Sequence, residues 1–311
     1  MNRFIDFIII MFVLFLCSCN KSEVEEEINI PTIDEDLLDI TTDVTNSFIT
    51  DSEIDGFTTI KDYFKNGDKV GIFALSSDEK SPYLNDLSMM NVMAYHEDKK
   101  WKYVNPITLN KEQATLYGYY PYEEGQSVDS IAIDTKTEID YLYTGKSTTV
   151  NAMSSKGKLT FNHVLTQLQV NFRKEDYKPK IGVTEIYFRS CKGKNSIPTK
   201  GYFSCRTGKV TVSDEEYGSI GTSNVNISDI PDKFKDSNIR NFITMPQTIN
   251  EGEVEIVAKI GGIDCVYTIP AGTKWEQGMR YVYNITFTVP KIDVTLVTIS
   301  SWINAPVIPL N

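Results

Sequence analysis

The chain has 311 residues and a formal net charge of −11. Because a phosphate backbone is bound by a basic surface, this charge argues against nucleic acid as a partner. The length suffices for one large or two medium domains after an N-terminal leader is set aside.

The chain begins with the features of an export signal. Arg3 supplies a positive charge, and residues 7–17 are all apolar. A transmembrane helix needs about 20 apolar residues, so this run is too short to span a bilayer. It fits the apolar region of a secretory signal.

The apolar run ends in Leu16-Cys17-Ser18-Cys19, which resembles the lipobox of bacterial lipoproteins. In that motif a small residue lies directly before the modified cysteine. Ser18 is small, whereas Leu16, directly before Cys17, is bulky. The resemblance implies cleavage between Ser18 and Cys19, with residues 1–18 as the signal peptide and lipid such as palmitate on Cys19. The alternatives are an ordinary signal peptide cut elsewhere and a signal anchor.

An acidic segment follows. Residues 20–27 are rich in glutamate, and this run resembles the surface-export signal of lipoproteins in one phylum of Gram-negative gut and oral anaerobes. A charge run is ordinarily a solvated tether, and the two interpretations are compatible. We expect residues 19–45 to form a flexible acidic tether, with room for a first strand near Phe48 and Ile49.

Strand signals recur through the first half. Stretches rich in apolar and aromatic residues predict strands at residues 70–75, 91–95, 101–103, 114–120 and 130–133. Residues 140–158, rich in Thr, Ser and Lys, predict a long loop. Residues 167–172 alternate Leu168, Val170 and Phe172 with polar residues, which predicts one face on a core and one in water.

The second half has the same character. Its predicted strands are residues 183–188, 201–204, 209–212, 241–245, 254–260, 264–269 and 280–289. Gly261-Gly262 predicts a hairpin turn. In the last strand, Tyr281, Tyr283, Ile285 and Phe287 fall on one face. A short helix is expected at residues 228–237.

Many short strands without long helical periodicity are typical of β-sandwiches or barrels. We therefore predict an all-β protein. Its N-terminal domain is expected to span residues 46–160 and its C-terminal domain residues 161–311.

Residues suited to catalysis or metal binding are few. His96 and His163 are the only histidines, and neither lies in a nucleophile-elbow or zinc-helix pattern. The acid pairs Glu123-Glu124 and Glu215-Glu216 lie near turn glycines and are expected to be solvated. We predict no catalytic residue, no metal site, no cofactor and no enzyme activity.

Three cysteines lie beyond the export signal: Cys191, Cys205 and Cys265. Their odd number prevents complete pairing within the chain, and their spacing matches no zinc site. A disulfide between Cys191 and Cys205 across a hairpin and three buried free thiols are the two alternatives.

Several short elements follow one another in a characteristic order. They are residues 66–73 (NGDKVGIF), Trp101, residues 117–122 (YGYYPY), 161–168 (FNHVLTQL), 245–249 (MPQTI), 275–286 (WEQGMRYVYNIT) and 299–302 (ISSW). In order and spacing these elements resemble the fimbrillin-like family of pilin subunits and related surface lipoproteins. The resemblance covers about residues 45–305.

The resemblance implies two tandem β-sandwich domains of transthyretin-like topology. It also implies export as a lipoprotein, proteolytic removal of the tether and a first strand, and completion of the open sheet by a strand of the next subunit. The best-studied protease of this family cuts after arginine, and no arginine occurs between Arg3 and Arg173. Cleavage after Lys61 or Lys65, another protease, or no cleavage remain as alternatives.

We predict a lipid-anchored protein of the outer membrane, displayed at the cell surface or in fimbriae. It would act as a fimbrial subunit or adhesin that assembles with other fimbrial subunits by strand addition. The alternative is a non-polymerising surface lipoprotein that binds a glycan or a host protein, with tyrosines of residues 117–122 stacking on sugars. Residues 294–302 would be either a donor strand or a strand of the second domain.

Overall fold

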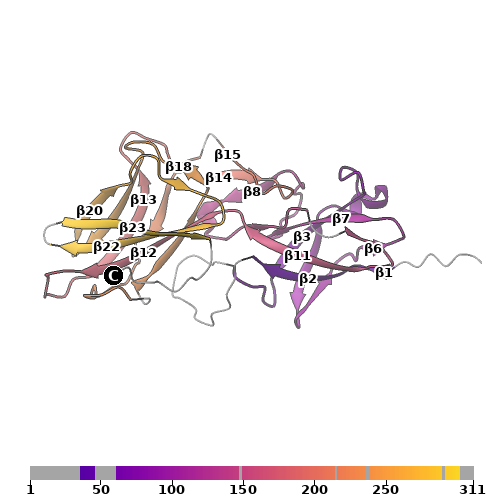
Figure 1. Ribbon diagram of the computed structural model, residues 1–311, viewed down its shortest axis with the longest axis horizontal. Helices are drawn as coiled ribbons and strands as arrows, with labels where there is room; N and C mark the ends of the chain where they lie inside the picture. The colour runs from indigo at the N-terminus through magenta and orange to yellow at the C-terminus, as the bar shows by residue number, and fades with distance from the viewer. Residues whose placement is uncertain are drawn as a thin grey trace, which may run out of the picture. The chain divides into compact units, whose positions relative to one another are not determined.

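The computed structural model describes residues 36–45, 61–146, 149–213, 216–235, 238–288 and 291–301 (Figure 1). These residues form β-strands and three short 3-10 helices: η1 (Tyr83–Asn85), η2 (Leu87–Met89) and η3 (Thr135–Thr137). The described part of the chain has no α-helix, which confirms a β-rich fold. None of its helices has the length and apolar character needed to cross a membrane.

An eight-stranded sheet forms the first half of the described chain. Its strands follow the order β2, β11, β9, β7, β3, β4, β5, and β10 pairs with β7. Only β2 and β11 are parallel neighbours among these described strands. The bounds are β2 (Asp39–Val44), β3 (Lys69–Leu75), β4 (Val92–Glu97), β5 (Lys100–Tyr103), β7 (Ala114–Tyr120), β9 (Leu142–Tyr143), β10 (Thr149–Val150) and β11 (Lys156–His163). A separate ladder joins β1 (Asp36–Leu37) to β6 (Thr108–Leu109).

Strand β3 shows why the sequence of residues 70–75 is apolar without alternation. Val70 and Ile72 belong to the core of the first half, whereas Phe73 and Leu75 belong to a second buried cluster. Because successive side chains of a strand point to opposite faces, a strand covered on both faces needs a continuous apolar run.

Two four-stranded sheets form the second half, with strand orders β17-β12-β22-β23 and β16-β13-β19-β20. Their apolar faces share one core cluster, which makes this half a β-sandwich. The bounds are β12 (Thr166–Lys174), β13 (Val183–Ser190), β16 (Ser219–Thr222), β17 (Arg240–Thr244), β19 (Val254–Ile260), β20 (Ile263–Thr268), β22 (Met279–Thr288) and β23 (Lys291–Ser301). β18 (Gln247–Thr248) pairs with β21 (Lys274–Trp275).

A three-stranded sheet connects the two halves. β8 (Ile131–Asp134) pairs with β14 (Lys200–Phe203), and β14 pairs with β15 (Val210–Val212). The predicted domain division after residue 160 falls inside β11. The chain changes sheet between β11 and β12, and β8 pairs with a strand that lies beyond the division.

The clearest predicted strand is confirmed. Tyr281, Tyr283 and Ile285 on β22 are at most 1% exposed, whereas Val282 and Asn284 on the other face are partly exposed. The predicted hairpin turn between β19 and β20 is also present. Gly261 and Gly262 there have φ angles of 58° and 84°, in the left-handed region that glycine adopts without strain.

The helix expected at residues 228–237 is wrong for the described residues 228–235, which form none. Asp229 Oδ1 instead accepts hydrogen bonds from Lys174 Nζ at 2.8 Å and from the Ile181 amide at 3.1 Å. The Ile230 amide donates to the carbonyl of Ile181. The polar groups of this segment therefore bind the connection between β12 and β13, and a helical ladder does not form.

Two further expectations need correction. The predicted loop at residues 140–158 contains β9, β10 and the start of β11, because its Thr-rich stretch pairs with β7. The polar face of β12 is buried and not in water. Gln167 Nε2 and Gln169 Nε2 both donate to Asn241 Oδ1, at 3.0 and 3.1 Å, so these amides satisfy one another between β12 and β17.

Candidate functional site

Strand β2 lies at the edge of the eight-stranded sheet. Among the described strands it pairs with β11 alone, in parallel register from Asp39 opposite Lys156 to Val44 opposite Phe161. It falls within residues 19–45, for which we expected a tether throughout. Its acidic residues favoured that expectation, but its apolar residues recur with the period of a strand. The expected first strand near Phe48 and Ile49 lies outside the described residues.

The apolar face of β2 completes the core of the first half. Leu38, directly before β2, and Ile40 and Val44 on β2 are only 3%, 3% and 4% exposed. They belong to the same cluster as Leu159 and Phe161 of β11. Burial of such a side chain contributes about 1.5–3 kcal/mol. Loss of β2 would therefore open an apolar groove along β11.

Trp101 links β2 to the opposite end of the sheet. It lies on β5, and its Nε1 donates a hydrogen bond to Thr42 Oγ1 on β2 at 3.1 Å. Since β2 and β5 are the two ends of the strand order, this contact joins the ends of one curled sheet. Trp101 is thus an anchor at the seam beside β2, in agreement with its expected structural role.

Lys61 lies in a buried polar cluster. Lys61 Nζ forms an ion pair with Asp68 at 2.8 Å, and the Lys61 amide donates to Asp140 Oδ2 at 3.1 Å. His163 Nδ1 lies 2.8 Å from the same Asp140 oxygen. Lys61, Asp140 and His163 are at most 4% exposed. This cluster fixes the start of residues 61–68 without using β2.

An aromatic residue reinforces this attachment. The ring of Phe64 packs edge-on against Trp101, Tyr120 and Phe161, with centroid distances of 5.2, 5.7 and 5.0 Å. Residues 61–68, which we call the anchor segment, are therefore held by both polar and apolar contacts.

The two lysines considered for cleavage differ in accessibility. Lys61 is buried, whereas Lys65 is exposed. Residues 46–60 contain no lysine or arginine. Lys65 is consequently the first basic residue after β2 that a protease could reach in the folded chain.

The C-terminal segment pairs within its own half. β23 forms an antiparallel ladder with β22, from Met279 opposite Ser301 to Thr288 opposite Lys291. Of the two alternatives for residues 294–302, the structure shows an internal strand for residues 294–301. Trp302 lies outside the described residues.

The three cysteines are free thiols, so the disulfide between Cys191 and Cys205 does not form. Cys205 Sγ donates to the carbonyl of Gly118 at 3.0 Å, and burial raises the pKa of this thiol. Cys265 is 8% exposed, and Cys191 is partly exposed. Ser18 and Cys19, the predicted cleavage and lipidation residues, lie outside the described part of the chain.

The remaining candidates occupy structural positions. Tyr117 and Tyr119 are 2% and 0% exposed, so neither can stack on a sugar. Glu216 forms ion pairs with Lys200 and Lys136. His96 packs edge-on against Trp101. Within the described ranges no group of His, Cys, Asp or Glu is placed to hold a metal ion.

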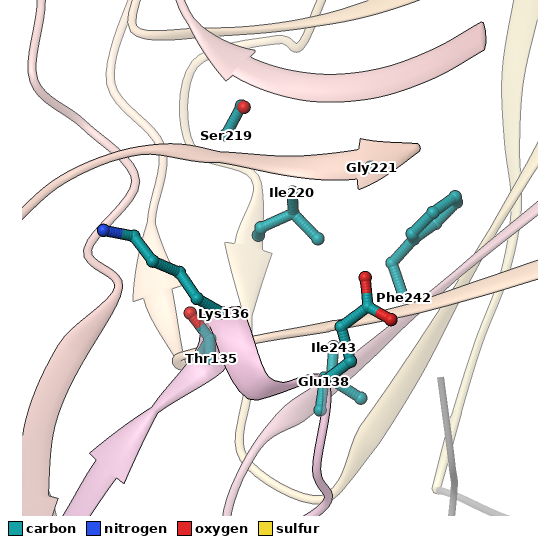
Figure 2. Close-up of a pocket in the computed structure, with 8 residues that line it drawn as sticks. All are labelled: Thr135, Lys136, Glu138, Ser219, Ile220, Gly221, Phe242 and Ile243. Carbon is teal, nitrogen blue, oxygen red and sulfur yellow. The ribbon is translucent and has the colours of Figure 1, made fainter. Parts of the chain in front are cut away.

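One small pocket, of about 170 Å³, lies where η3 and the loop after it meet β16 and β17 (Figure 2). Its lining consists of Thr135, Lys136, Glu138, Ser219, Ile220, Gly221, Phe242 and Ile243. Figure 2 shows the Glu138 carboxylate directed toward Phe242 and the ammonium end of Lys136 directed away from it. Sequence reasoning missed this pocket because its residues come from three distant segments without a common motif.

Comparison with known families decides the class of this protein. A model of the fimbrillin-like family matches residues 57–302. The chain belongs to the fimbrillin-like family. Membership places this fimbrillin-like chain among fimbrial and adhesion proteins of the cell surface, a structural class and not a class of enzymes. No curated protein matches the chain.

Solved structures share the fold of this fimbrillin-like protein. A candidate cell adhesion protein from Bacteroides uniformis superposes with a TM-score of 0.63 at 16% identity, covering 86% of this chain and 99% of that one. One from Bacteroides ovatus gives 0.62 at 18% identity, with 87% and 99% covered. A fimbrial protein from Bacteroides vulgatus gives 0.56 at 18% identity, with 86% and 99% covered. At these identities the likeness establishes the fold.

Proposed function

We propose that this chain is a surface-displayed fimbrial subunit or adhesin in which a strand of a neighbouring subunit takes the place of β2. The observation that carries the proposal is the position of β2 as a parallel edge strand that fills the core groove of the first half. The domains would be tandem sandwiches of transthyretin-like topology, residues 46–160 completed by β2 and residues 161–311, preceded by the acidic tether and by a signal peptide at residues 1–18.

Strand addition explains why the groove suits another chain. An added strand pairs its backbone with the free edge of β11, and alternate side chains enter the positions of Leu38, Ile40 and Val44. A parallel ladder between neighbours is slightly less stable per residue than an antiparallel one, so replacement by an incoming strand is energetically accessible. The anchor segment keeps its own buried contacts and remains in place during the replacement.

Release of β2 requires a cut after Thr45. Lys65 is the first exposed basic residue after β2 and is a candidate position for this cut. Before that cut, lipid on Cys19 would anchor the protein to the outer membrane, and the acidic residues 20–27 would direct it to the cell surface. Its partners would be other subunits of the same family, with a host protein or glycan as a further ligand.

Strand exchange can be tested in vitro. A variant is made from the chain that lacks the signal peptide. In it, residues 51–57 are replaced by the recognition sequence of a site-specific protease. After the cut, the protein is incubated with a labelled peptide of residues 36–45. We expect uptake of the peptide and release of the resident fragment, because the groove is complete only with a strand in it.

Two peptide variants provide the matched control. Ile40→Asp places a charge in the core and should abolish uptake, whereas Thr41→Asp lies on the exposed face and should leave uptake unchanged. Equal uptake of both variants, or no uptake by the cut protein, would contradict the proposal.

The alternative of a non-polymerising glycan-binding lipoprotein has less support. It was motivated by the tyrosines of residues 117–122. Tyr117 and Tyr119 are buried in the core, whereas Tyr120 and Tyr122 are partly exposed and pack against core clusters. No observation on the described surface favours a sugar site in their place.

A further inference from the structure

Glu138 is a partly buried carboxylate without a described hydrogen-bond donor. It follows η3, and its backbone has a φ of 56°, a left-handed conformation that is uncommon for a residue other than glycine. Burial raises the pKa of its carboxyl, and no charged neighbour opposes this effect. The carboxylate points into the pocket in Figure 2.

Two lysines of these segments, Lys136 and Lys200, form ion pairs with another carboxylate. Lys136 Nζ lies 3.4 Å from Glu216, and Lys200 Nζ lies 2.7 Å from the same carboxylate. Among the lining residues Lys136 is the one cation, and its ammonium group is directed away from Glu138. The pocket therefore presents one uncompensated negative charge to solvent.

One apolar side chain reaches the surface of the pocket. Ile220 is partly exposed there, whereas Phe242 and Ile243 are only 2% and 1% exposed. A ligand with an aliphatic stem can cover this surface while its polar end stays at the carboxylate.

Volume limits the ligand. The pocket holds about 170 Å³, whereas sites for drug-sized molecules have about 300–1,000 Å³. It is therefore too small for an oligosaccharide or a nucleotide, and its size suits one long side chain.

We propose that this pocket binds a single alkyl cation, such as a lysine or arginine side chain, with its charge on Glu138 and its aliphatic stem on Ile220. Charge-assisted hydrogen bonds to a carboxylate are about twice as strong as neutral ones, and Glu138 supplies such an acceptor. This binding goes beyond the fimbrial role proposed above, since it requires no strand exchange.

The test is to titrate the chain that lacks the signal peptide with small-molecule probes. Binding is monitored through the methyl NMR signals of Ile220 and Ile243. The probes are Nα-acetyl-lysine N-methylamide, the corresponding arginine compound, and the neutral norleucine compound. We expect saturable shifts of these methyl signals with either cationic probe and no comparable shift with the norleucine probe.

Two variants test whether the Glu138 carboxylate is the group that binds the cation. Glu138→Gln should weaken binding at least about tenfold, which corresponds to about 1.4 kcal/mol. Glu124→Gln, at an exposed turn residue, should leave binding unchanged. Equal binding by the norleucine probe, unchanged affinity of Glu138→Gln, or unmoved methyl signals would overturn the proposal.

The source of the cation is distinguished by a further probe. Tighter binding of the blocked lysine than of n-butylammonium would identify a peptide side chain as the ligand, since backbone amides then add contacts. Equal affinities would identify a free amine. Both results support a site for an alkyl cation.

Discussion

Trp101 Nε1 donates a hydrogen bond to Thr42 Oγ1 across 3.1 Å, from one end of the eight-stranded sheet to the other. The donor lies on β5 and the acceptor on β2, so this bond forms only while β2 occupies its groove. It therefore reports directly on whether the edge strand is in place.

The first prediction concerns this bond. Trp101→Phe keeps an aromatic ring but removes the donor, and Thr42→Val removes the acceptor. Each should lower the free energy of unfolding by about 1 kcal/mol, and the two losses should be less than additive because both remove the same bond. A double-mutant cycle by chemical denaturation measures the coupling, and strictly additive losses would show that the bond contributes nothing.

The second prediction concerns the anchor segment. Asp68→Asn leaves the buried ammonium of Lys61 without its counter-ion, which should cost about 3–5 kcal/mol. The double variant Lys61→Met, Asp68→Leu removes both charges and should lie close to the unmodified protein. Thermal melting of the unmodified protein, Asp68→Asn and the double variant measures these differences in stability. A mild effect of Asp68→Asn would mean that solvent reaches Lys61.

The third prediction concerns the alternation on β22. Phe287 is 7% exposed, and Phe287→Ala should cost about 3–5 kcal/mol as a large-to-small change in the core. Thr286→Ala, on the other face, loses one hydrogen bond from Arg173 and should cost only about 1 kcal/mol. Equal costs in urea unfolding would refute the assignment of faces.

The fourth prediction distinguishes an internal strand from a donor strand. Deletion of residues 291–311 removes β23 and exposes the edge of β22, so we expect a lower melting temperature and aggregation. If the shortened monomer melts unchanged while high-mass ladders disappear from cells, this segment is a donor and its pairing with β22 is dispensable.

The fifth prediction concerns the lipid. Cys19→Ala should abolish incorporation of labelled palmitate and retention in the membrane, whereas Cys17→Ala should change neither. The reason is the small Ser18 before Cys19 and the bulky Leu16 before Cys17. Labelling that survives Cys19→Ala would place the anchor elsewhere.

Regular alternation made much of the fold predictable. Tyr281, Tyr283 and Ile285 alternate with Val282 and Asn284, and they line the core as expected. The same rule was misleading for Gln167 and Gln169, because alternation identifies a polar face but not what covers it. Their amides are satisfied by Asn241, which is distant in the sequence.

The candidate sites were less predictable, because they depend on contacts between distant segments. The Asp140 carboxylate receives the amide of Lys61 and faces the ring of His163, and no local pattern joins these three residues. Strand β2 was missed for a different reason. Its aspartates resemble the acidic residues expected for a tether, and they outweighed the strand-like spacing of its apolar residues.

The most direct test of the central claim is to shear surface material from native cells and identify this chain, and its first residue, by mass spectrometry. Our account predicts that the chain occurs in SDS-resistant high-mass ladders and that in these ladders it begins after Thr45, without β2. A chain found only as a monomer that still begins at Cys19 would contradict assembly by replacement of this strand.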